Sequence, residues 1–95
     1  MAAVIDALLE RHKEKIAEYL ELRRQANAAG LAAEIGKQQH YENQALVVLG
    51  YMDGLWYAAS SSYEWQAANA MHEAANRMRG QAFDEMMAAF NKGAA

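Results

Sequence analysis

The sequence predicts an all-α protein, a small antiparallel bundle of three helices. The chain of 95 residues has no proline, no cysteine and only 6 glycines, so little interrupts a helix. Alanine, glutamate, glutamine, leucine and methionine, all good helix formers, are abundant. Apolar residues recur at steps of three and four in three long stretches. Neither a repeat nor a low-complexity linker divides the chain, and its length suits one domain, residues 1–95, with one core.

The first helix is predicted over residues 2–29. Its polar side carries charges of both signs, which suits a face turned to water. Gly30 can adopt the left-handed conformation that ends a helix, and Leu31 can pack back on the last turn. If Gly30 does not break the chain, the protein would be a long two-helix hairpin instead. The apolar face of this helix contains Ile5, Leu8, Leu9, Ile16, Tyr19 and Leu20.

The second helix is predicted over residues 31–59. It is apolar around its whole circumference from residue 45 onward, where Asp53 is the only charge. A helix of this kind must be covered on most sides, so we expect the bundle to pack in a homo-oligomer. Gly50 and Gly54, four residues apart, would let a neighbouring helix approach closely.

The third helix is predicted over residues 62–91, followed by a frayed tail at residues 92–95. Ser61 and Glu64 have the spacing of a capping box, which marks the start of a helix. A seam of alanines and methionines along this helix would allow close packing. Beside the seam, a second stripe combines aromatic and polar side chains, namely Trp65, His72, Arg79, Phe83 and Phe90.

Four polar residues lie within the apolar faces of the first two helices. His12 and Arg23 are eleven residues apart, and so are Glu42 and Asp53. A hairpin that turns near residues 30–34 would place Arg23 opposite Glu42 and His12 opposite Asp53. Because a buried charge needs a partner, we predict two buried cross-helix pairs that fix the register. In the alternative, Glu42 lies at the surface and only Asp53 is buried.

Catalysis and cofactors find little support in these residues. An acid and base pair of His12 and Asp53 would also need a nucleophile and a pocket that excludes water, so we predict no enzyme. The three histidines lie in three different segments, without a Glu-x-x-His or His-x-x-x-His pattern, so no metal is predicted. The glycine motifs of nucleotide-binding loops are missing, and no cofactor is predicted. If a small ligand binds, Tyr57, His72 and Arg79 would contribute stacking and charge.

Charge and hydropathy argue against two classes of partner. The net charge is −3 without a cluster of basic residues, which excludes nucleic acid as an expected partner. The apolar run of the second helix is too short to span a bilayer and has Asp53 at its centre, so a membrane-active protein is a lesser alternative. The beginning of the chain does not resemble a signal peptide, and the expected location is cytoplasmic.

The leading prediction is a non-enzymatic protein–protein interaction module, a self-associating helical adaptor or an inhibitor that docks on a partner protein. The first alternative is a small-ligand or nucleotide binder at an oligomer interface. Small size and the lack of cysteine would also suit an accessory protein of a virus, although no residue pattern specifies that origin. The residues expected at the interface are Val48, Met52, Leu55, Trp56, Trp65, Phe83, Met87 and Phe90.

Overall fold

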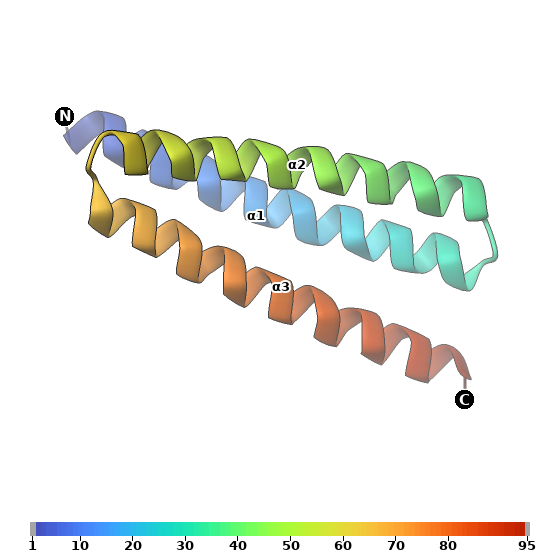
Figure 1. Cartoon of the computed structure of the whole chain (residues 1–95). Helices are drawn as coiled ribbons and strands as arrows, with labels where there is room; N and C mark the ends of the chain where they lie inside the picture. The colour runs from blue at the N-terminus through green and yellow to red at the C-terminus, as the bar shows by residue number, and fades with distance from the viewer. Residues whose placement is uncertain (1, 95) are drawn as a thin grey trace.

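The protein is a bundle of three long helices that run up, down and up (Figure 1). A computed structural model describes residues 2–94, with α1 at Ala2–Leu31, α2 at Ile35–Ser61 and α3 at Trp65–Ala94. The predicted all-α class and the three-helix bundle are confirmed, and the hairpin alternative is wrong. The bundle is elongated, measuring 50 × 22 × 17 Å, because each helix runs almost from one end of the bundle to the other.

The first turn falls a few residues later than the sequence predicts. The helix α1 continues through Gly30, and the residue in the left-handed conformation is Ala33, with φ of 56°. The amide of Glu34 donates to the carbonyl of Ala29 at 2.8 Å, and that of Ala33 donates to Gly30 at 3.1 Å. These two bonds form a Schellman motif, which satisfies carbonyls at the end of a helix. The motif needs a residue in the left-handed conformation, and alanine adopts this conformation at a cost in conformational free energy.

The second turn repeats the first one thirty residues further along the chain. Tyr63 is left-handed with φ of 60°, and the amide of Glu64 donates to the carbonyl of Ala59 at 2.9 Å. The predicted capping box is therefore wrong, because Ser61 is the last residue of α2 and not the cap of α3. Helix α3 also continues through residues 92–94, which were expected to fray, while residue 95 lies outside the described residues.

The core consists mainly of small side chains. Seven of the twelve buried apolar residues are alanines, so the helix axes can approach one another closely along these positions. The middle of the bundle packs around Leu20, Val48, Met52, Met78 and Ala82. The end next to the second turn packs around Ala59, Ala67, Ala68 and Met71.

Helix α1 is the central element of the packing. It contacts both α2 and α3, most extensively α2, whereas α2 and α3 contact each other least. Figure 1 shows the two diverging towards the free end of α3. One ion pair joins α1 to α3 among the described residues, from Arg24 Nε to Glu85 Oε1 at 2.8 Å. The side of the bundle between α2 and α3 is consequently its most open side.

Replacement of the left-handed residues by glycine should stabilise the fold. We expect Ala33→Gly and Tyr63→Gly each to raise the free energy of unfolding by about 0.5–1 kcal/mol in urea denaturation, because relief of left-handed strain exceeds the entropy that glycine adds to the unfolded chain. The control Ala28→Gly, within α1, should lower it by about 1 kcal/mol. A loss of stability in Ala33→Gly would show that this turn is not strained.

Gly50 and Gly54 make no close helix contact within the chain. Both are exposed, and a Cβ atom at either position would meet no neighbouring atom within 4 Å. Gly50→Ala and Gly54→Ala should therefore each raise the thermal midpoint, by a gain of roughly 0.4–1 kcal/mol in helix stability. A lower midpoint in either variant would mean that another chain packs against this side of α2.

Candidate functional site

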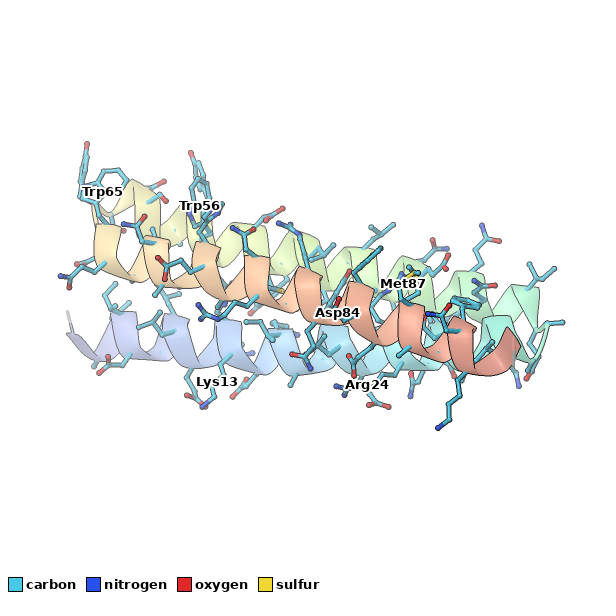
Figure 2. All side chains as sticks on the ribbon, turned by 90° about the horizontal axis from the view of Figure 1, so that it is seen from below. Lys13, Arg24, Trp56, Trp65, Asp84 and Met87 are labelled. Carbon is cyan, nitrogen blue, oxygen red and sulfur yellow. The ribbon has the colours of Figure 1, made fainter. Side chains whose placement is uncertain are left out.

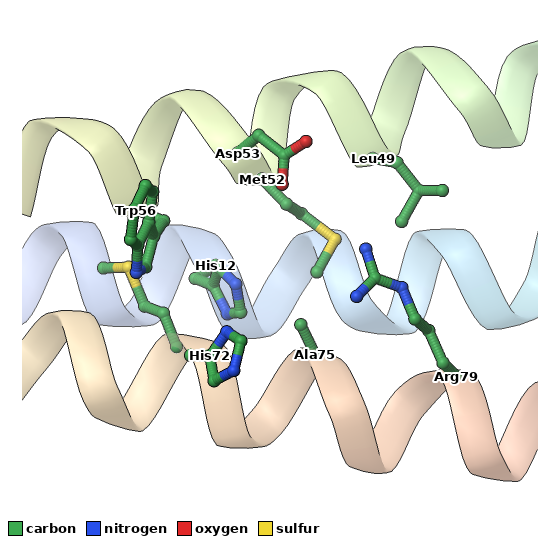
Figure 3. Close-up of a pocket in the computed structure, with 9 residues that line it drawn as sticks. His12, Leu49, Met52, Asp53, Trp56, His72, Ala75 and Arg79 are labelled. Atoms are coloured by element: carbon green, nitrogen blue, oxygen red, sulfur yellow. The ribbon is translucent and has the colours of Figure 1, made fainter.

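A pocket of about 300 Å³ lies between α2 and α3, with α1 at its floor. Its apolar lining comes from Leu49, Met52, Met71 and Ala75. Five further side chains line the pocket: His12, Asp53, Trp56, His72 and Arg79. They supply an indole and all of the polar groups of the pocket, and Figure 3 shows them around one hollow. A few polar groups that converge on an apolar hollow are typical of a small-molecule site.

His12 forms the polar part of the pocket floor. Its side chain is only 4% exposed, and no hydrogen bond joins it to another described residue. Burial lowers the pKa of His12 below its ordinary value of 6.5. The imidazole is therefore mostly neutral at pH 7, with one nitrogen that donates and one that accepts a hydrogen bond.

The two walls of the pocket carry opposite charges. Asp53 and Trp56 lie about one turn apart on α2, while His72 and Arg79 lie two turns apart on α3 (Figure 3). Nε2 of His72 lies 3.3 Å from the side-chain amide of Asn76, which is on the same helix. Neither Asp53 nor Arg79 belongs to an ion pair among the residues that the structure describes.

The predicted buried pair of His12 with Asp53 is not formed. Both residues line the pocket. Nearby, the ammonium of Lys15 on α1 lies 4.7 Å from the ring centre of Tyr51 on α2, and this contact is within one residue of the predicted register. Asp53 is nevertheless exposed and forms no ion pair with His12. Its position at the edge of α2 allows water to solvate the carboxylate, so the cost of burying the charge is avoided.

The predicted pair of Arg23 with Glu42 is also not formed. Oε1 of Glu42 is 3.3 Å from Nε2 of Gln38, one turn earlier on α2. A neutral amide on the same helix therefore satisfies this half-buried carboxylate. Arg23 is half-buried and instead lines a second hollow of about 260 Å³, which it shares with Arg79 and Phe83.

The structure separates the predicted interface residues into two groups. Val48 and Met52 are buried in the core of the single chain, and Leu55 is half-buried against the cluster beside the second turn. Val48 and Met52 are therefore covered by the chain itself and are not free for a partner, contrary to the prediction. The other five remain exposed: Trp56, Trp65, Phe83, Met87 and Phe90.

Sequence reasoning also missed several residues of the surface and the pocket. Leu46, Val47 and Tyr51 are exposed on α2, and a helix that is apolar on every side carries no periodic signal to identify its outer side. Tyr57, expected beside His72 and Arg79, is exposed and does not line the pocket. The spacing of Asp53 and Trp56 on α2 could have indicated that they share a wall.

The pocket offers binding groups and lacks several groups that catalysis commonly uses. Its lining contains no hydroxyl, thiol or amine that could act as a nucleophile. Among the described residues, no three histidine, aspartate or glutamate side chains gather closely enough to hold a metal ion. None of the described helices combines the length and apolarity required to cross a bilayer.

The lowered pKa of His12 predicts a specific pH dependence of stability. Between the unfolded pKa near 6.5 and the lower folded pKa, the unfolded chain binds more protons, so this contribution to stability is complete above 6.5 and falls as the pH decreases. In urea unfolding from about pH 7.5 to 5, the slope of the unfolding free energy against pH should be smaller in His12→Gln than in the wild type. Equal slopes in the wild type and His12→Gln would contradict this assignment.

Comparisons of the chain with protein-family models, curated proteins and solved structures gave no match. The function is therefore inferred from the residues themselves.

Proposed function

We propose that this chain is a non-enzymatic helical interaction module that self-associates, with a second copy covering the half of the side between α2 and α3 where the two helices diverge. The observation that supports this most strongly is the location of the large aromatic side chains. Both tryptophans and both phenylalanines of the chain are exposed, while alanine and methionine dominate the core. We call the exposed set Trp56, Trp65, Phe83, Met87 and Phe90 the aromatic face.

The aromatic face lies away from the most charged side of the bundle. Figure 2 shows Trp56 and Trp65 pointing to one side of the bundle, whereas Lys13, on α1, points to the opposite side. Phe83 and Phe90 follow Trp65 on α3 by 18 and 25 residues, close to five and seven helical turns, so they share its side. One side of the molecule is suited to water, and the other is suited to burial.

The accessible area fits an interface of standard size. The structure exposes 6272 Å². A compact monomer of 10.5 kDa exposes about 5,400 Å², which leaves an excess of roughly 870 Å². A standard interface buries about 800 Å² on each partner. Helix α1 packs beneath α2 and α3, so the open side between them is left for a second copy to cover.

A second copy is favoured over other occupants by symmetry. In a two-fold interface each copy presents the same patch, so one apolar surface is sufficient to build a closed dimer. The aromatic face combines aromatic residues with a methionine, which are enriched at interface cores. His72 and Arg79 lie on the same stripe of α3, nearer the second turn than Phe83 and Phe90.

Light scattering across a hundredfold range of concentration tests this proposal. We expect a fixed multiple of 10.5 kDa for the wild type. The double variant Phe83→Gln and Phe90→Gln should have a dissociation constant at least about tenfold higher than that of the wild type. A loss of about 1.4 kcal/mol of burial free energy raises this constant by that factor. Helical content measured by circular dichroism should stay unchanged, since neither side chain is buried.

Val47→Gln is the matched control, because Val47 is exposed on α2 and lies outside the aromatic face. This variant should keep the wild-type mass. A wild-type monomer at every concentration would refute self-association. An oligomer that Val47→Gln dissociates and the phenylalanine variant does not would place the interface on the outer side of α2, contrary to the proposal.

A further inference from the structure

We propose that the pocket between α2 and α3 binds a small aromatic zwitterion of amino-acid size, one that carries a carboxylate, an ammonium and an aromatic body. This site is formed within one chain, so the inference does not depend on self-association. The groups that recognise the ligand come from all three helices: His12 from α1, Asp53 and Trp56 from α2, and His72 and Arg79 from α3.

The floor of the pocket is suited to an aromatic body with one hydrogen-bonding group. Met52 and Met71 are buried beneath it, and methionine side chains make favourable contacts with aromatic rings. His12 is buried to more than nine-tenths, lines the pocket and has no hydrogen-bond partner among the described residues. An indole N–H or a phenol hydroxyl at this depth would supply that partner, whereas a purely apolar body would leave the imidazole unsatisfied.

The mouth of the pocket is suited to the two charges of a zwitterion. Asp53 on one wall and Arg79 on the other are exposed, and neither is neutralised by an ion pair in the described chain. A guanidinium binds a carboxylate through paired hydrogen bonds, and a carboxylate binds an ammonium. Trp56 lies on the same wall as Asp53, where its ring can also attract the ammonium. A ligand with both charges therefore satisfies both walls at once.

The volume of the pocket limits the size of the ligand. The space of about 300 Å³ corresponds to roughly ten water molecules. This favours a single aromatic ring system with a short charged head. Arg23 borders the neighbouring hollow together with Arg79 and adds positive charge on the side where the ligand carboxylate would lie.

Three related probes separate the contributions of the two charges. Tryptophan carries both charges, tryptamine lacks the carboxylate, and indole-3-propionate lacks the ammonium. Binding is measured by NMR titration, followed through the His12 imidazole and the methionine methyl signals. Tryptophan should bind with a Kd at least tenfold lower than either of the other two probes, since each lost charge removes a charge-assisted hydrogen bond.

Two variants then assign each ligand charge to one wall. Arg79→Gln should raise the Kd of tryptophan to that of tryptamine and leave the Kd of tryptamine unchanged. Asp53→Asn should likewise remove the advantage of tryptophan over indole-3-propionate. Asp53 and Arg79 are exposed, so these variants keep the fold. Arg77→Gln and Asp84→Asn are matched controls, because they change the same residue types on α3 outside the pocket and should change no Kd.

Three results would overturn the inference. The first is the absence of pocket signals that respond to tryptophan. The second is equal binding of the three probes, which would mean that the charges are not recognised. The third is tighter binding of indole-3-propionate than of tryptophan, which would assign the pocket and the hollow beside Arg23 to anions. The Phe83→Gln and Phe90→Gln variant should retain the site, because neither residue lines this pocket, so a failure of self-association and a failure of binding are distinguishable.

Discussion

The fold depends on close contact between helices that carry small side chains where they meet. Alanines at positions such as Ala26, Ala45 and Ala59 are almost completely buried, so the backbones lie near one another and little room is left for bulk. Methionines occupy the remaining gaps because their unbranched side chains adapt to irregular space. The buried core of the described chain contains neither tryptophan nor phenylalanine. These large aromatic residues lie on the outside, where they become available for binding.

The central position of α1 explains why one side of the bundle stays open. Its apolar stripe meets both other helices, and the ion pair between Arg24 and Glu85 connects it to α3 on the side away from the pocket. Helices α2 and α3 have no comparable stripe for each other, and charged residues such as Asp53 and Arg79 lie along their shared edge. Complete closure of this edge would remove both charges from water, at a cost of several kcal/mol for any charge left unpaired. The pocket exists because α1 packs extensively against both other helices, whereas α2 and α3 pack little against each other.

The sequence predicts the helices well because long apolar periodicity, without proline, leaves helix as the only regular option. It predicts the turns less well, since the Schellman motif needs one left-handed residue and Ala33 is not a typical one. The two cross-helix pairs that the equal spacing of polar residues predicts are not formed. The exposure of Asp53 could not be predicted, since side-chain orientation at the edge of a helix depends on how far α3 diverges from α2.

The exposed aromatic face and the pocket arise from the same arrangement, and they place different demands on it. Association requires Phe83 and Phe90 to lose water, whereas recognition of a zwitterion requires Asp53 and Arg79 to remain accessible. Both can be met if the second copy covers the divergent half of α3 and leaves the half nearer the second turn open. Trp56 and His72 lie nearer that turn than Phe90 does, because α2 ends at Ser61 and α3 begins at Trp65. The divergence of α3 would therefore separate the two activities along the length of one small molecule.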